Sequence, residues 1–326
     1  MISWRTWRTW RLGESKNLFR LPRNSFKDVK KTRILIIGDQ GQVGWELQRS
    51  MATLGDVIAI GRKTQPIAID LADPDTIRRA VREIKPDWII NAAAYTAVDK
   101  AEEEPDLAMA VNGTAPGILA EEAKAIKATL IHYSTDYVFD GKATEPYKEE
   151  GPTNPLSVYG KTKLAGEKAV KAVDGRYLIF RTSWVYGFRG HNFLMTMRRL
   201  AQEREELRIV DDQYGAPTWC RHIAEATSQA VSQCVVNSDL VDEKRGLYHL
   251  SSDGMTTWYG FSRLIFELMR EAGEKILLQS VKPITTEEYP LPAPRPGYST
   301  LDNTKLRHHF GVVLPDWKLV LDQVMK

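Results

Sequence analysis

One local pattern constrains the fold of this chain more than any other: a short apolar run leads directly into three spaced glycines and an amphipathic segment. Arg33-Ile-Leu-Ile-Ile37 is long enough for a buried parallel strand, and the glycines follow in Gly38-Asp-Gln-Gly41-Gln-Val-Gly44. Apolar residues then recur at helical spacing from Val43 to Leu54, which predicts a helix that stops at Gly55. Glycines at this spacing permit a tight turn, and the start of the helix offers free N–H groups to a pyrophosphate. The pattern therefore predicts the first unit of a sheet that binds a dinucleotide.

The segments that follow extend this unit into a doubly wound parallel sheet. Further strands are predicted at Val57–Ile60, Trp88–Ile90 and Thr129–Tyr133. Between the first two of these, a helix is expected to begin at Asp73-Pro74 and to end at Pro86. The expected fold class is thus α/β of the Rossmann type.

The residues after the second of these strands bear on the choice of cofactor. Folds that select NAD usually place an acidic residue there to hold the ribose hydroxyls, but this chain has Gly61-Arg62-Lys63. Two cations suit a 2′-phosphate, which favours NADPH over NADH, although a solvated basic loop would look the same. Small residues in Asn91-Ala-Ala-Ala94 would let a cofactor lie close to the backbone.

Three residues predict a site for reducing a ketone. Thr135 follows the strand that begins at Thr129, and Tyr159 and Lys163 form a YxxxK motif one helical turn apart. A tyrosine can donate a proton to a carbonyl oxygen if a nearby cation stabilises its phenolate, and Lys163 supplies that charge. Thr135 would add a hydrogen bond to the same oxygen.

Composition excludes several other classes of protein. With 43% hydrophobic residues, the chain can bury a core, and it has no apolar run of the roughly 18–20 residues that span a membrane. Cys220 and Cys234 are its two cysteines, which suits a reducing, cytoplasmic location. Residues 1–31 carry a net charge of +7, and residues 32–326 carry a net charge of −4. Because the body of the protein is slightly acidic, no nucleic-acid partner is inferred. This basic stretch is expected to be a disordered extension outside the fold.

The glycine turn together with Thr135, Tyr159 and Lys163 resembles the extended short-chain dehydrogenases/reductases and, among them, the dTDP-4-dehydrorhamnose reductase family. The resemblance covers about nine-tenths of the chain, all but the basic extension. The segments that carry it are GxxGQVGWELQ (Gly38–Gln48), NAAAYTAVDKAE (Asn91–Glu102), HYSTDYVFDG (His132–Gly141), PLSVYGKTKLAGE (Pro155–Glu167), FRTSWVYG (Phe180–Gly187), NFLMTMRRLAQEREEL (Asn192–Leu207), DDQYGAPT (Asp211–Thr218) and YSTLDNTKL (Tyr298–Leu306).

The resemblance implies roles for individual positions. Tyr159 would be the proton donor, Lys163 its partner and Thr135 the third catalytic residue. Thr135 and Asp136 would touch the sugar, and Trp184 would cover its apolar face. With the positions derived above, the cofactor site would comprise Gly38, Gly41, Gln42, Val43, Gly44, Arg62, Asp70, Leu71, Ala94, Tyr95, Thr96, Tyr133, Tyr159 and Lys163.

The expected domains are a dinucleotide-binding domain over residues 32–185 and a smaller, interleaved substrate-binding domain over residues 186–326. Residues 210–240 are expected to return to the first domain. The implied reaction is the NADPH-dependent reduction of the 4-keto group of dTDP-4-dehydro-β-L-rhamnose, with use of NADH left open. A homodimer and Mg²⁺ at a dimer contact near Glu46 are also left open, whereas Cys220 and His222 are expected to pack in the core.

Two alternatives remain at this stage. One is a non-catalytic NADP-binding regulatory subunit, similar to the beta subunit of methionine adenosyltransferase. The other is a different sugar-nucleotide epimerase or reductase, although a dehydratase would normally carry a second acidic residue where this chain has Tyr137.

Overall fold

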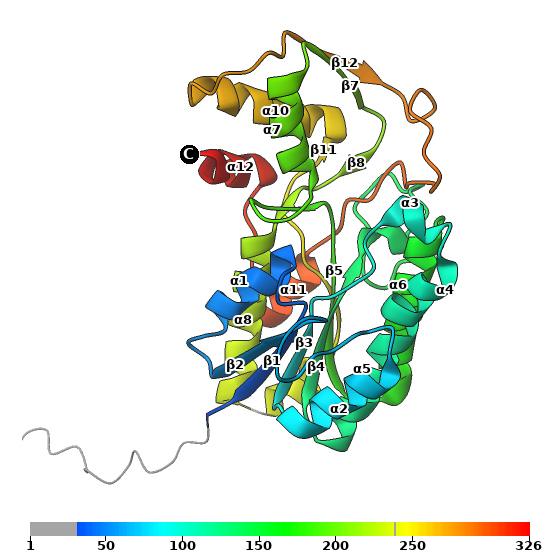
Figure 1. Ribbon diagram of the computed structural model, residues 1–326, viewed down its shortest axis with the longest axis vertical. Helices are drawn as coiled ribbons and strands as arrows, with labels where there is room; N and C mark the ends of the chain where they lie inside the picture. The colour runs from blue at the N-terminus through cyan, green and yellow to red at the C-terminus, as the bar shows by residue number, and fades with distance from the viewer. Residues whose placement is uncertain (1–30, 238) are drawn as a thin grey trace, which may run out of the picture. The chain divides into compact units, whose positions relative to one another are not determined.

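A parallel sheet of six strands, in the order β10-β5-β4-β3-β1-β2, lies at the centre of the computed structural model (Figure 1). The strands are β1 (Arg33–Ile37), β2 (Asp56–Ile60), β3 (Trp88–Asn91), β4 (Thr129–Thr135), β5 (Arg176–Thr182) and β10 (Gly246–His249). The structure describes residues 31–237 and 239–326, and Thr32–Lys326 form one unit. The prediction for the basic extension falls on residues 1–30 and so lies outside the described residues, apart from Lys31.

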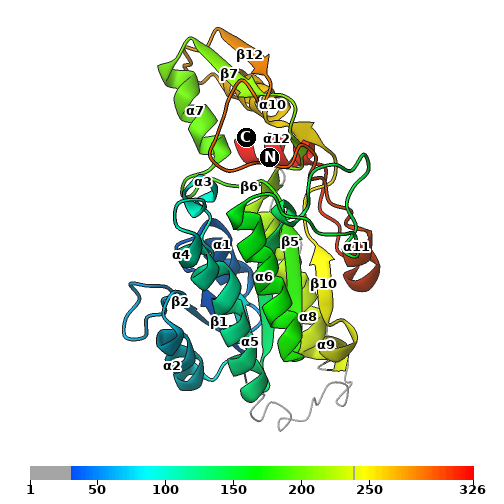
Figure 2. The same ribbon diagram turned by 90° about the vertical axis from the view of Figure 1, so that its right-hand side faces the viewer.

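Helices cover both faces of this sheet, which explains why its strands are apolar without alternation. One face carries α1 (Gln42–Ser50), α8 (Cys220–Val236), α9 (Asp239–Glu243) and α11 (Thr304–Phe310). The other carries α2 (Pro74–Ile84), α5 (Ala115–Ala125) and α6 (Val158–Val173), of which α5 and α6 lie side by side in Figure 2. All seven residues of β4 are buried, so the strand that ends at Thr135 lies in the middle of the protein.

A second apolar core lies beyond the carboxyl ends of the strands, in the upper part of Figure 1. It is built from α7 (Phe193–Glu203), α10 (Trp258–Glu271), α12 (Trp317–Met325) and the parallel pair β7 (Glu206–Val210) and β12 (Ser280–Ile284). Short pairs link the two cores: β6 (Val185–Tyr186) with β9 (Thr218–Trp219), and β8 (Tyr214–Gly215) with β11 (Thr256–Thr257).

The chain passes between the two cores more than once. From β9 it enters α8, which packs against α1, and β10 then joins the sheet beside β5. After β12 the chain returns to the sheet through α11 before α12 closes the second core. The domain bounds expected from the sequence stay a prediction.

The first helix is shorter than its apolar spacing predicts, which corrects the expectation that it runs to Gly55. α1 ends at Ser50, and the amide of Leu54 bonds the carbonyl of Met51 in a turn. Any side chain at Gly55 would collide with the carbonyl of Thr32, beside which β2 begins. The helix ends early because the chain must already turn back toward β1 at this point.

No helix in the described ranges is both long and apolar enough to cross a membrane.

Candidate active site

The predicted catalytic threonine and tyrosine meet at the carboxyl end of β4. Thr135 Oγ1 donates to Asp136 Oδ1 at 3.0 Å and accepts from the amide of Tyr137 at 3.2 Å. Tyr159, in the first turn of α6, lies close enough to Thr135 for this neighbour to lower its pKa slightly. The ring of Tyr137 lies edge-on to that of Tyr159, with 5.5 Å between ring centroids. The tyrosine is therefore held on two sides.

The start of α6 is positioned by two local features. Ser157 caps the helix by accepting a hydrogen bond from the amide of Gly160 at 3.2 Å. A side chain at Gly160 would collide with the carbonyl of Tyr137, so a glycine is needed for this close approach. Together they place Tyr159 directly opposite the end of β4.

Lys163 is buried one turn further along the helix, with 2% of its surface exposed. Its Nζ donates to the backbone carbonyl of Tyr133 at 2.5 Å. Burial lowers the pKa of Lys163 to about 8, and the negative charge of Glu167 opposes this change. The cation therefore persists at neutral pH but is less stable than an exposed lysine.

The same burial acts on the two acidic groups of the site. Part of the Tyr159 surface is open to solvent, yet burial raises its pKa to about 12, and the nearby Thr135 lowers it by a smaller amount. Burial also raises the pKa of Asp136 to about 6, partly offset by the nearby Ser299 and by the hydrogen bond from Thr135. Tyr159 thus holds its proton at neutral pH and can donate it.

The glycine turn fits a dinucleotide. Gly38 has φ of +97°, and a Cβ there would lie 2.9 Å from the amide nitrogen of Ala93. A side chain at Gly44 would collide with the carbonyl of Gly38. Gly41 is the N-cap of α1 and supplies no side-chain cap, so the first N–H groups of the helix remain available to a phosphate. Gln42 Oε1 accepts a hydrogen bond from Asn192 at 3.0 Å, and Val43 packs on the first core.

At the end of β2 the structure shows a feature that the sequence did not predict. Arg62 and Lys63 are exposed, and neither has a hydrogen-bond or ion-pair partner among the described residues. The carboxylate of Asp39, however, lies directly against Gly61. Asp70 and Leu71 follow across the next turn, where Leu71 is buried in the sheet's core.

The loop after β3 brings in a residue that the sequence analysis missed. Asn112 accepts from the amide of Tyr95 at 2.9 Å and donates to its carbonyl at 3.0 Å, which fixes the segment Ala94-Tyr95-Thr96. Asn112 lies in the π-helical turn Ala110–Thr114, between α4 (Pro105–Met109) and α5. No local pattern marks it, because its partner lies on a different element.

The residues expected to contact a sugar follow the carboxyl ends of two neighbouring strands, with Asp136 after β4 and Trp184 after β5. Asp136 is 2% exposed, and its Oδ2 has no hydrogen-bond partner among the residues that the structure describes. Trp184 adopts φ of +45°, and its ring stacks on Trp258 with centroids 3.5 Å apart. Gln213 accepts from Trp258 Nε1 at 3.1 Å. Trp258 and Gln213 therefore extend the contacts of Trp184. Gln213 lies within the quoted motif Asp211–Thr218 but was given no role from the sequence, and Trp258 lies in none of the quoted motifs.

Tyr133 contributes to the site through its backbone. Its hydroxyl forms a 2.7 Å hydrogen bond with Thr227 of α8. The side chain therefore points to the face of the sheet that α1 and α8 cover, opposite to α6. Its carbonyl is the group that holds Lys163.

The RmlD substrate binding domain family model matches residues 32–326. This chain belongs to that family. It is 46% identical over 292 residues to the dTDP-4-dehydrorhamnose reductase of Escherichia coli K12, which covers 90% of this chain and 96% of the relative. A solved reductase of that name from Clostridium acetobutylicum has a TM-score of 0.80 and 39% identity, covering 90% of this chain and 98% of its own. A third, from Bacillus anthracis in complex with NADP, has a TM-score of 0.79 and 35% identity, with coverage of 90% and 98%. The expected α/β fold of extended short-chain dehydrogenases/reductases is confirmed.

The described residues offer no cluster of metal ligands that would support the expected Mg²⁺ site. Within residues 31–237 and 239–326, no three His, Cys, Asp or Glu side chains come together as metal ligands would, and this includes the surroundings of Glu46. Cys220 and Cys234 are buried, and burial raises the pKa of the Cys220 thiol to about 12.

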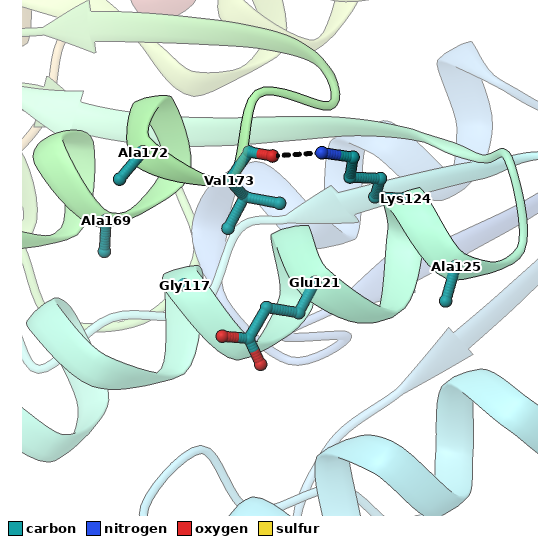
Figure 3. A pocket seen from close by; sticks show the side chains of 7 residues that line it. All are labelled: Gly117, Glu121, Lys124, Ala125, Ala169, Ala172 and Val173. Atoms are coloured by element: carbon teal, nitrogen blue, oxygen red, sulfur yellow. Dashed lines mark hydrogen bonds between the residues drawn. The ribbon is translucent and has the colours of Figure 1, made fainter.

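A surface hollow between α5 and α6 lies apart from these residues. Figure 3 shows it lined by small side chains with Glu121 and Lys124, the latter donating to the carbonyl of Val173 at 2.7 Å. None of the predicted site residues lines it.

Proposed function

We propose that this protein is an NADPH-dependent reductase that converts the 4-keto group of dTDP-4-dehydro-β-L-rhamnose to a hydroxyl, giving dTDP-β-L-rhamnose. The observation that carries the proposal is the place of Tyr159 in the first turn of α6, which packs against the end of β4 that bears Thr135, one turn before the buried cation of Lys163. The name of the Escherichia coli relative supports the choice of substrate.

Each catalytic side chain has a defined task in this reduction. The hydride needed at the carbonyl carbon is what NADPH supplies when it is bound. Tyr159 donates its phenolic proton to the carbonyl oxygen, so that one hydride and one proton convert C=O to CH–OH. Lys163 stabilises the phenolate that remains, and Thr135 orients the phenol and the carbonyl oxygen by hydrogen bonding.

The chain offers a complete set of groups to hold the cofactor. Gly41, Gln42 and Val43 would bind the pyrophosphate at the start of α1. Ala94-Tyr95-Thr96 would line the middle of the cofactor, held in place by Asn112. Arg62 would face the 2′-phosphate, and the complex of the Bacillus anthracis reductase with NADP supports this choice. The homodimer and the cytoplasmic location stay predictions.

The experiment is to incubate purified protein with NADPH and a panel of 4-keto-6-deoxy sugar nucleotides. We expect oxidation of NADPH with dTDP-4-dehydro-β-L-rhamnose and a product that carries two more hydrogens. Binding of NADPH without turnover of any sugar would favour the regulatory-subunit alternative. Turnover without net oxidation of NADPH would favour an epimerase.

A further inference from the structure

The side chain of Asp39 occupies the space that a residue after β2 would otherwise fill. Asp39 lies in the glycine turn, between Gly38 and Gly41, while Gly61 is the first residue after β2. A Cβ at Gly61 would collide with Asp39 Oδ1, so the glycine makes room for this carboxylate. The acidic group that the sequence lacks at position 61 is therefore supplied from a neighbouring loop.

This carboxylate is held in place but keeps one oxygen free. Asp39 Oδ2 accepts from Gln40 Nε2 at 2.9 Å and from Thr64 Oγ1 at 3.4 Å. Thr64 Oγ1 in turn accepts from the amide of Gly61 at 2.9 Å, which ties the two loops together. Oδ1 has no hydrogen-bond partner in the part of the chain that the structure describes, and Asp39 is only partly exposed.

We propose that Asp39 is a specificity-determining residue that accepts a hydrogen bond from the 2′-hydroxyl of the adenosine ribose. In dinucleotide folds the ribose lies at the end of the second strand, which is where Oδ1 is presented. A carboxylate favours a free hydroxyl and repels a 2′-phosphate, whereas Arg62 has the opposite preference. Asp39 and Arg62 thus oppose each other, and the protein binds NADH as well as NADPH. This inference rests on the proposed function.

The test measures binding rather than turnover. Dissociation constants of NADH and NADPH are determined by fluorescence titration for the unmodified protein and for Asp39→Asn. Losing a charged acceptor should shift the preference toward NADPH by about tenfold. Asp75→Asn is the matched control, because it removes an exposed carboxylate from the first turn of α2. It should leave the ratio unchanged.

A second variant separates position from charge. Gly61→Ala keeps the Asp39 carboxylate but displaces it, so it should shift the ratio in the same direction as Asp39→Asn. An unchanged ratio in Asp39→Asn, with both cofactors still bound, would overturn the inference and leave the proposed function intact. Failure of the unmodified protein to bind either cofactor would overturn the proposed function itself.

Discussion

Glu167 and Arg181 form an ion pair that is almost completely removed from solvent, with 1% and 2% of their side chains exposed. Arg181 Nε and Nη2 donate to the two carboxylate oxygens at 2.8 and 2.7 Å, and Ser134 Oγ adds a third hydrogen bond at 2.6 Å. The pair joins α6 to β5 and β4, one turn beyond Lys163. It therefore holds the helix that carries Tyr159 and Lys163 against the sheet.

Glu167→Gln should lower the free energy of unfolding by about 3–5 kcal/mol, because it leaves the Arg181 charge buried without compensation. Urea unfolding measures this change. Asp242→Asn breaks the exposed ion pair with Arg176 and is the matched control, with an expected loss of about 0–1 kcal/mol. Equal losses in the two variants would contradict the role assigned to burial.

Tyr159→Phe should reduce kcat by roughly 10²–10⁴-fold, since it removes the proton donor without altering the packing of the ring. The dissociation constant of NADPH should hardly change. Steady-state kinetics with the sugar nucleotide and a binding titration test both statements. Tyr289→Phe, at an exposed tyrosine, should have no effect. Turnover within a few-fold of the unmodified enzyme would exclude Tyr159 as the donor.

The dependence of kcat/KM on pH should show a decline as the pH rises through about 8, where Lys163 loses its proton. Above this pH the phenolate of Tyr159 has no cation to stabilise it. Since the Glu167 charge raises the pKa of Lys163, Glu167→Gln should move the decline to lower pH. Lys161→Met, at an exposed position of α6, should leave it in place. A flat profile to pH 10 would contradict the assignment.

Asp136 should make the protein less stable as the pH rises. Its pKa of about 6 lies above the ordinary value of 3.8, so the folded state favours the protonated form. Its stabilising contribution is complete below pH 4 and is lost as the pH rises through 6. Asp136→Asn should therefore gain stability relative to the unmodified protein between pH 4 and 7, by up to about 3 kcal/mol. Urea unfolding at pH 4 and at pH 7 measures this difference, and Asp106→Asn, at an exposed position, is the control. The prediction is refuted if the two variants change stability by the same amount between these pH values.

Arg62→Ala should weaken binding of NADPH by on the order of tenfold to a hundredfold, because it removes a charge-assisted hydrogen bond to the 2′-phosphate. Binding of NADH should hardly change, and the difference should narrow as salt screens this exposed site. Titrations at two salt concentrations measure both effects, with exposed Arg79→Ala as control. Equal weakening of the two cofactors would show that Arg62 does not distinguish them.

Local spacing was enough to predict the parts of the molecule that lie within one or two adjacent elements. The strand Arg33–Ile37, its glycine turn and the start of α1 follow from a run of apolar residues and three glycines. Tyr159 and Lys163 share one side of α6 because they are four residues apart on a helix. These features depend on backbone geometry that repeats along the chain, so a sequence displays them directly.

Contacts between distant elements were decided only by the tertiary structure. The approach of Asp39 to Gly61, the hold of Asn112 on Tyr95 and the stacking of Trp184 on Trp258 each join two separate segments. Such contacts depend on how the helices and loops pack against the sheet, and no periodic pattern of residues along the chain encodes this packing. The sequence alone thus determined that the chain has a dinucleotide fold with a tyrosine–lysine motif. The three-dimensional packing determined which side chains around that motif are buried, which form hydrogen bonds or ion pairs, and which expose their charges.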